Sequence, residues 1–203
     1  MNRWILPTTA AAALVVAGGF AWTTYFSGGD LSECTAGAVA GGAIGGPFTL
    51  MDETGREVTD ADVITKPTLV YFGYTFCPDV CPIDTQRTGL AIDLLEEQGY
   101  DVGSLFISVD PDRDTPEVLA NYTDNFHERM VGLTGTREQI DAAARAYKVA
   151  YTIGDQSDEY YLVDHTVQTY LMTPEEGFID FFRRETSAED MAARTACVID
   201  ALS

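Results

Sequence analysis

Residues 67–84, with the sequence P-T-L-V-Y-F-G-Y-T-F-C-P-D-V-C-P-I-D, constrain the fold of this chain more than any other stretch. The apolar, aromatic and β-branched run at 69–72 predicts a buried strand. A helix is expected over residues 82–99, because a proline fits the first helical position, leucines recur at helical spacing and a glycine ends the pattern. Cys77 and Cys81 are therefore expected just before this helix or in its first turn.

Two cysteines in that position favour redox or metal chemistry. The partial positive charge at a helix N-terminus stabilises thiolates, the form of cysteine that attacks disulfides and binds metals. A C-x-x-C spacing is typical of thioredoxin-like exchange, whereas the C-x-x-x-C spacing of Cys77 and Cys81 can direct two sulfur atoms at one ion. The alternative is structural: two inert buried cysteines, or a bridge that closes a short loop and stabilises little.

One histidine completes a possible ligand set. The segment 160–166, Y-Y-L-V-D-H-T, carries His165, one of only two histidines in the chain. Alone, such a residue is more often a hydrogen-bonded structural side chain than a ligand. Together with Cys77 and Cys81 it makes a set of two sulfurs and one nitrogen, which favours Cu(I) and allows Cu(II) or Zn(II). Asp164 is expected either to orient the imidazole ring or to lie at the rim of the site.

The charge of the chain limits its partners. The 203 residues include 32 acidic and 12 basic side chains, a formal net charge of −20. Nucleic acids and anionic membrane surfaces are therefore disfavoured, whereas a cation or a basic protein surface fits. Solubility alone is an equally good explanation of the charge. The length and the hydrophobic content of 46% indicate one globular domain with an appendage.

The N-terminal segment, residues 1–29, predicts a single membrane anchor. Residues 4–26 carry no charge and are long enough to cross a bilayer once. Arg3 precedes this run and acidic residues follow it, which predicts a cytoplasmic N-terminus and an external remainder. A cleaved signal peptide is the alternative, because threonines and glycines dilute the run. A lipoprotein signal also places a cysteine such as Cys34 after an apolar run, but Glu33 stands where that signal has a small residue.

Residues 30–203, which follow the predicted anchor, divide into a tether and a domain. Residues 30–46 are assigned to a glycine-rich tether and residues 47–203 to the folded domain. A hairpin over 48–58 is predicted to begin the domain, with its turn at 52–55. A second buried strand at 102–109 follows the first strand and its helix. This order implies a right-handed parallel crossover and an α/β sheet.

The second half of the domain continues the α/β pattern. The acidic segment 110–117 predicts a helix start rather than a hard-cation site, because it offers an N-cap, a proline and an acidic first turn. That helix is expected to run through Phe126, with His127 at the surface near its end. Further helices are predicted after Thr136 and Ser187. Three strands are expected to close the sheet, at 149–153, 168–172 and 178–182.

Three motifs together resemble a known family. They are Y-F-G-Y-T-F-C-P-D-V-C-P, S-V-D-P-D-R-D-T-P and Y-L-V-D-H-T, in this order. They look like the Sco/SenC family of membrane-anchored, thioredoxin-like copper proteins, and the resemblance covers residues 45–202. It implies an α/β thioredoxin-like fold with an N-terminal β-hairpin extension, preceded by one transmembrane helix. It also implies a site for Cu(I) or Cu(II) built from Cys77, Cys81 and His165.

The same resemblance implies a function. A protein of this family would assist assembly of the dinuclear copper (CuA) centre of cytochrome c oxidase, by delivering copper or by reducing the cysteines of the acceptor. The implied partners are subunit II of the oxidase or another copper-accepting protein, a possible copper donor chaperone, and the membrane through the N-terminal helix. The implied location is the inner membrane, with the C-terminal domain in the periplasm.

A thiol–disulfide enzyme is the main alternative. In a reductase or peroxidase of thioredoxin-like architecture, Cys77 would attack and Cys81 would resolve. Thioredoxins place a cis-proline opposite their dithiol, and this chain has no proline between Pro116 and Pro174. That departure, and the presence of His165, favour a metallochaperone over an enzyme. A redox sensor signalling through a Cys77–Cys81 disulfide is a third possibility.

The two remaining cysteines are Cys34 and Cys197. If Cys77 and Cys81 stay free for copper, only a bond between Cys34 and Cys197 leaves the site intact, and the expected oxidising compartment permits it. Such a bond would pin the tether to the final helix. The alternatives are that Cys197 is an ordinary buried helix residue and that Cys34 is free or lipidated.

Overall fold

The computed structural model of the chain describes residues 31–35 and 44–203. The expected membrane span at 4–26 and most of the expected tether lie outside the described residues. Within the described part, no helix combines the length and the apolar character needed to cross a membrane.

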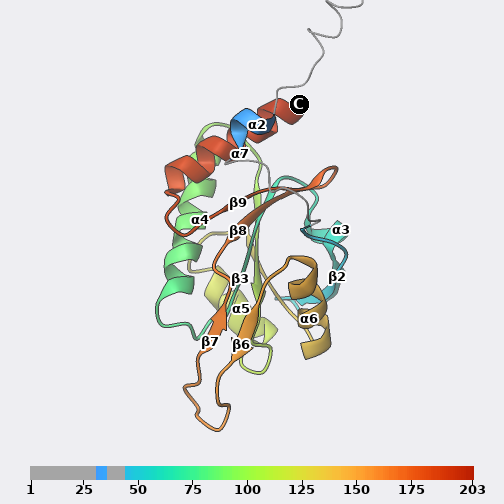
Figure 1. Cartoon of the computed structure of the whole chain (residues 1–203), viewed down its shortest axis with the longest axis vertical. Helices are drawn as coiled ribbons and strands as arrows, with labels where there is room; N and C mark the ends of the chain where they lie inside the picture. Colours follow the sequence, from blue (N-terminus) through green and yellow to red (C-terminus); the bar gives the residue numbers. More distant parts are fainter. Residues whose placement is uncertain (1–30, 36–43) are drawn as a thin grey trace, which may run out of the picture.

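A seven-stranded mixed sheet forms the centre of the fold (Figure 1), in the order β2-β1-β5-β4-β3-β8-β9. Its strands are β1 (Thr49–Asp52), β2 (Glu57–Thr59), β3 (Thr68–Gly73), β4 (Gly103–Ser108), β5 (Met130–Thr134), β8 (Thr169–Thr173) and β9 (Gly177–Phe182). The inner strands β3, β4 and β5 are parallel, and the outer strands run antiparallel to their neighbours. The predicted parallel crossover from β3 to β4 is confirmed.

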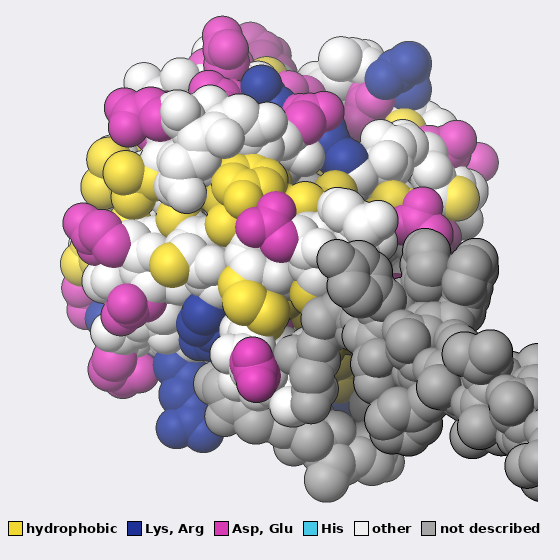
Figure 2. Space-filling model, turned by 90° about the horizontal axis from the view of Figure 1, so that it is seen from above, with side chains coloured by type: hydrophobic (Ala, Val, Ile, Leu, Met, Phe, Trp, Pro, Cys, Tyr) yellow, Lys and Arg dark blue, Asp and Glu magenta, His cyan; other side chains and the backbone are white. Residues whose placement is uncertain are grey.

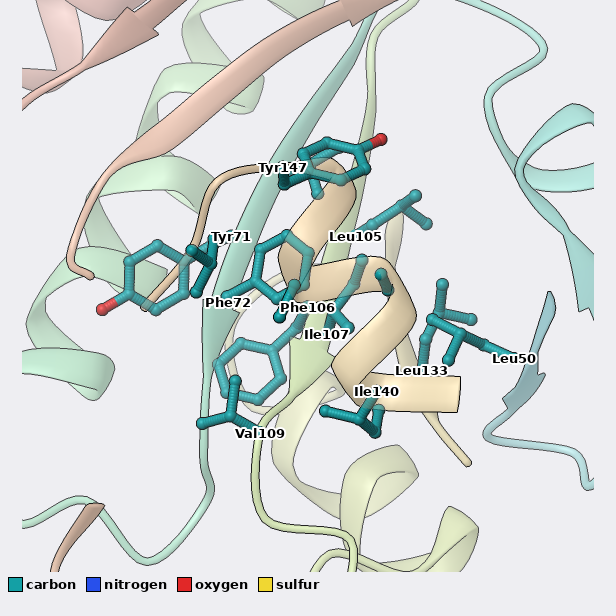
Figure 3. Packing of buried hydrophobic residues seen from close by; sticks show 14 of the residues in the cluster. Leu50, Tyr71, Phe72, Leu105, Phe106, Ile107, Val109, Leu133, Ile140 and Tyr147 are labelled. Atoms are coloured by element: carbon teal, nitrogen blue, oxygen red, sulfur yellow. The ribbon is translucent and has the colours of Figure 1, made fainter. Parts of the chain in front are cut away.

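Helices cover both faces of the sheet, so that β3 is buried at all six positions. On one face α4 (Val80–Glu97) packs against α7 (Ala188–Leu202), around Leu69, Ile92 and Met191. On the other face α6 (Arg137–Ala146) contributes to a cluster that includes Phe72 and Tyr147, whose rings lie 5.2 Å apart (Figure 3). The shorter helices are α2 (Leu31–Cys34), α3 (Asp60–Val63) and α5 (Pro116–Thr123).

Local sequence signals account for most helix starts. Thr115 caps α5 by accepting a hydrogen bond from the backbone N–H of Val118, with Pro116 in the first turn. Thr136 and Gln139 form the predicted capping box of α6. The acidic segment 110–117 is thus a helix start, as predicted. The helix ends at Thr123, three residues earlier than expected.

The N-terminal hairpin of β1 and β2 extends the sheet beyond β5, as predicted. Its turn closes with a hydrogen bond from the backbone N–H of Gly55 to the carbonyl of Asp52. Asp52 is 3% exposed, and its carboxylate accepts hydrogen bonds from Thr54 and Arg56. Burial opposes ionisation of this group, but those hydrogen bonds lower the pKa of Asp52 to about 2.

The pKa of Asp52 predicts how the stability of the hairpin depends on pH. A carboxylate whose pKa is lower in the folded state stabilises the fold above its unfolded pKa, and this stabilisation is lost as pH falls from about 4 to about 2. We expect Asp52→Asn to lower the free energy of unfolding at pH 7 by about 1–2 kcal/mol. This is less than the full free energy implied by the pKa difference, because Arg56 is exposed and solvent screens its interaction with Asp52. Urea unfolding at several pH values measures this difference, and the two proteins should converge near pH 2. A difference that stays constant down to that pH would contradict the prediction.

One strand prediction was wrong, and one strand was missed. The segment expected at 149–153 does not join the main sheet: β6 (Tyr151–Ile153) pairs with β7 (Val163–His165) in a separate two-stranded sheet. The central strand β5 was not predicted. Its Gly132 interrupts the apolar pattern because a Cβ there would lie 2.7 Å from the Cβ of Leu119 in α5, so the close approach of the helix requires glycine.

The expectation that His127 lies at the surface was also wrong. Its side chain is 7% exposed, and its ring contacts Asp93 on α4, with 3.3 Å between Nε2 and Oδ1. The Nδ1 atom accepts a hydrogen bond from the backbone N–H of Arg129 at 3.0 Å. The chain folds back after α5, which buries the ring between elements that are distant in sequence.

The surface of the protein is strongly acidic. Figure 2 shows acidic side chains spread over the face seen from above, with fewer basic ones.

Candidate metal centre

The two free cysteines lie at the corner between β3 and α4. Cys77 follows the strand, and Cys81 is the second residue of the helix, so both positions agree with the prediction. The backbone N–H of Cys81 points at the sulfur of Cys77, with 3.4 Å between the two atoms. Cys81 is fully buried and Cys77 is 9% exposed. The helix terminus thus presents two sulfur atoms on one side of the corner.

Gly73, the last residue of β3, makes room for the sulfur of Cys81. A Cβ at this position would lie 3.1 Å from Cys81 Sγ and 2.8 Å from the ring of Tyr71. A side chain here would therefore push the helix and its cysteine away from the strand. The glycine belongs to the site although it offers no ligand atom.

His165 reaches the cysteines from the separate two-stranded sheet. It is the last residue of β7, and its Nε2 lies 3.2 Å from Cys81 Sγ. Its Nδ1 lies 2.9 Å from the carbonyl oxygen of Thr166, which can only accept a hydrogen bond, so the hydrogen of the neutral ring is placed on Nδ1. This tautomer leaves the lone pair of Nε2 available to a metal ion. The ligand atoms of Cys77, Cys81 and His165 all lie within 4.8 Å of one another.

Aromatic rings hold the imidazole in place. The rings of Tyr71 and Tyr74 meet His165 edge to face, at centroid distances of 6.1 Å and 5.8 Å. The site opens into a cleft of about 370 Å³ lined by Tyr74, Cys77 and His165, together with Leu162 and Asp164. One side of the ligand set is therefore packed and the other is accessible.

Asp164 lies at the rim of this cleft and is exposed. The hydrogen-bond partner of the imidazole is the carbonyl of Thr166, not the carboxylate of Asp164. Of the two roles considered for Asp164, the structure therefore places it at the rim.

The two thiols differ in acidity. Hydrogen bonds from the side chain and the backbone N–H of Cys81 lower the pKa of Cys77 to about 3, although burial acts in the opposite direction. The same contact with Cys77, together with burial, raises the pKa of Cys81. Cys77 is thus a thiolate at neutral pH, available as a metal ligand or as a nucleophile.

A second cluster that could hold a metal ion consists of Asp93, Glu96 and His127. Both nitrogens of this imidazole already have partners, since Nδ1 accepts from a backbone N–H and Nε2 faces Asp93. Because Nδ1 accepts a hydrogen bond, the hydrogen of the neutral ring is on Nε2. A metal ion could bind Nε2 only by replacing that hydrogen. The arrangement of His127 is that of a structural histidine.

The pair Cys34–Cys197 forms a disulfide, with 5.4 Å between the Cα atoms. Cys34 ends α2 and Cys197 lies in α7, so the beginning of the segment assigned to the tether is attached to the final helix. Figure 1 shows α2 beside α7 at the upper end of the molecule, whereas β7 and the start of α4 lie towards the lower end. The disulfide and the candidate metal centre are therefore far apart.

Comparisons with known proteins agree with this geometry. The family model for SCO1/SenC matches residues 37–200. Protein SenC of Rhodobacter capsulatus is 53% identical over 199 residues, covering 97% of this chain and 90% of the relative. The mitochondrial SCO1 homologue of Homo sapiens is 44% identical over 156 residues, covering 75% of this chain and 52% of the relative.

Solved structures give the same result. The crystal structure of Arabidopsis thaliana ScoI with copper bound has a TM-score of 0.72 and 40% sequence identity, covering 79% of this chain and 98% of that one. The similarity includes the thioredoxin-type α/β fold with its mixed sheet. From the family model, the relatives and the shared fold, we conclude that this chain belongs to the SCO1/SenC family.

Proposed function

We propose that this chain binds copper through Cys77, Cys81 and His165 and assists assembly of the CuA centre of cytochrome c oxidase. The observation that carries the proposal is the convergence of these three side chains from two separate parts of the fold, within 4.8 Å. Family membership supports the role, because the SCO1/SenC family is involved in copper assembly of cytochrome c oxidase.

The donor set fits copper as a cargo. Two soft sulfur ligands and one imidazole nitrogen suit Cu(I) and accept Cu(II). Three protein ligands leave a coordination position through which a second protein can take the metal, and the cleft beside Cys77 gives access to it. The tautomer of His165 leaves the lone pair of Nε2 for a metal ion, and the low pKa of Cys77 favours the thiolate that a metal ion binds.

The proposed location is the inner membrane, with the folded domain in the periplasm. The uncharged run at 4–26 supports an anchor, and the charges around it support this orientation. The disulfide between Cys34 and Cys197 is consistent with an oxidising compartment.

Thiol reduction of the acceptor is the second candidate function. It is favoured by the unequal acidity of the two cysteines, because a low-pKa Cys77 beside a high-pKa Cys81 is an attacking thiolate next to a resolving thiol. In that reaction Cys77 and Cys81 give two electrons to the acceptor disulfide and form a disulfide themselves, while the two acceptor sulfurs take one proton from the thiol of Cys81 and one from solvent.

One experiment with two arms tests both functions. Copper-loaded protein is mixed with the reduced, metal-free copper domain of oxidase subunit II, and copper-free dithiol protein is mixed with the oxidised domain plus free copper. We expect the visible absorption of the dinuclear centre to form in the first arm, since the open coordination position permits transfer. Formation only in the second arm would assign the protein to thiol reduction. Formation in neither arm would contradict the proposed function.

A further inference from the structure

The segment 110–114, between β4 and α5, contacts both loops that carry the candidate ligands. The cysteine loop, residues 74–79, joins β3 to α4 and contains Cys77. The histidine loop, residues 154–162, joins β6 to β7 and leads to His165. These contacts involve side chains that the proposed function does not use.

Asp114 fixes the segment to the cysteine loop. It is fully buried, and its carboxyl group accepts hydrogen bonds from the backbone N–H of Thr75 at 3.0 Å and from the hydroxyl of Thr75 at 2.6 Å. The two bonds fix both the backbone and the side chain of Thr75, which lies two residues before Cys77. The segment and the cysteine loop therefore form one unit.

Arg113 and Asp110 fix the segment to the histidine loop through Tyr161. The guanidinium of Arg113 lies over the ring of Tyr161, with 3.5 Å between Cζ and the ring centroid. Asp110 is fully buried and accepts hydrogen bonds from the hydroxyl of Tyr161 at 2.7 Å and from Nε of Arg113 at 2.6 Å. Tyr161 is thus held at its ring by a cation and at its hydroxyl by a carboxylate.

The same guanidinium also faces the cysteine loop. Its Cζ lies 4.8 Å from the ring centroid of Phe76 and 5.8 Å from that of Tyr74, whose ring in turn packs against His165. Nη2 of Arg113 is buried and has no hydrogen-bond partner in the described part of the chain, so aromatic faces supply its favourable contacts. One planar side chain therefore joins the two loops.

The hairpin that carries His165 needs such support. Its strands β6 and β7 have three residues each, and among the described strands they pair only with each other. An isolated two-stranded hairpin is only marginally stable in water. Tyr151 attaches the hairpin to α6 by a hydrogen bond to Asp141, and Tyr161 attaches it to the segment 110–114. Loss of the second attachment should therefore loosen the hairpin without releasing it.

We infer that Arg113 and Tyr161 are positioning residues: their stack, completed by Asp110, keeps His165 beside the two cysteines. When only a fraction of the molecules holds a ligand in place, the apparent affinity falls by that fraction. The stack thus raises copper affinity without contact to copper. The inference rests on the proposed function only for its copper measurement, because the stability of the hairpin can be measured in the metal-free protein.

The first test is the Cu(I) affinity of the full chain, measured by competition with a chelator of known affinity. Tyr161→Ala removes the ring and the hydroxyl but leaves the ion pair of Arg113 and Asp110 in place. We expect a loss of about tenfold, the low end of the range for residues that support a metal ligand. Tyr161→Phe keeps the stacked ring and should recover most of this loss. The matched control is Tyr160→Ala, since Tyr160 is 77% exposed in the same loop, and it should stay within about twofold of the wild type.

A double-mutant cycle separates positioning from a general loss of stability. In the His165→Ala background there is no imidazole to position, so Tyr161→Ala should change the affinity by less than about twofold. A loss of the same size in both backgrounds would show that Tyr161 acts on the cysteines or on the whole fold, and would overturn the inference.

Hydrogen exchange of the metal-free protein, followed by peptide mass spectrometry, gives the second test. The hairpin closes with a hydrogen bond from the backbone N–H of Gly154 to the carbonyl of Leu162 at 2.9 Å. In Tyr161→Ala we expect exchange in the peptides of the hairpin to become about tenfold faster, because a loosened hairpin opens more often. Exchange in β3 should keep its wild-type rate, and so should the hairpin of Tyr160→Ala. Wild-type exchange of the hairpin in Tyr161→Ala would contradict the inference.

Arg113→Lys tests the other half of the stack and replaces Tyr161→Ala if that variant does not fold. Lysine keeps the positive charge beside Asp110 but lacks the flat guanidinium that covers the rings. We expect faster exchange of the hairpin and a several-fold loss of copper affinity, and wild-type values of both would overturn the inference. If the wild-type protein binds no copper, the proposed function fails, and hydrogen exchange alone still decides whether Arg113 and Tyr161 hold the hairpin.

Discussion

Replacement of His165 by alanine is expected to lower the affinity for Cu(I) at least about a hundredfold, equal to about 2.8 kcal/mol. The variant loses one of three ligands and leaves the two sulfurs of Cys77 and Cys81 at the N-terminal end of α4. Loss of a partner that only supports a metal ligand costs ten- to hundredfold, so loss of a ligand should cost no less. Competition with a Cu(I) chelator of known affinity measures the change.

The chain supplies its own control for this variant. His127 is the other histidine, and its ring is held by Asp93 and Arg129 away from the cysteines. His127→Ala should therefore keep the wild-type copper affinity. A protein in which Cys77 and Cys81 are oxidised gives the reference for a site without thiolates. Equal affinity in His165→Ala and the wild type would remove the imidazole from the ligand set.

The corner that carries the cysteines could be predicted because its signals are local. The apolar run of β3, the proline in the first turn of α4 and the leucine spacing lie within one continuous stretch. Each signal acts through contacts a few residues apart, which is the range over which sequence patterns are informative. The hairpin of β1 and β2 was predictable for the same reason.

The route by which His165 reaches the site could not be predicted from such patterns. Its strand β7 has three residues and pairs with another three-residue strand, β6. A pattern of two-residue period needs a longer run to be distinguished from a loop. The donor chemistry of two thiolates and one imidazole, and then the motif resemblance, indicated that His165 joins the cysteines.

The side chains behind the ligands were missed for a different reason. Tyr71 was assigned only to the buried strand and Asp84 was given no role, because the hydrogen bond from the Tyr71 hydroxyl to Asp84 is set by the packing of α4 on β3. Gly73 was given no role either, although a Cβ at this position would lie 3.1 Å from the sulfur of Cys81. The aspartate three residues after Cys81, within the predicted helix, is the sequence feature that could have drawn attention to this group.

The second large effect is expected from the disulfide at the other end of the molecule. Cys34 and Cys197 are 163 residues apart in sequence, and Cys34 is 6% exposed. In the chain-entropy model a bond closing a loop of this length destabilises the unfolded chain by about 5 kcal/mol, and removal of native disulfides costs about 2–5 kcal/mol. We expect Cys197→Ser to lower the free energy of unfolding by about 2–5 kcal/mol.

The measurement is denaturant unfolding of the full chain, after mass spectrometry has identified a peptide that links residues 34 and 197. Cys34→Ser removes the same bond, so it should cost as much as Cys197→Ser, and the double variant should cost little more than either. Reduced wild-type protein should approach the stability of these variants, because it lacks the same constraint. Copper affinity should be unchanged in all of them, since the bond joins α2 to α7 and touches none of Cys77, Cys81 and His165. Wild-type stability in Cys197→Ser under oxidising conditions would show that the bond does not constrain the unfolded chain. A loss of copper affinity in any of these cysteine variants would show that the two ends of the domain are coupled.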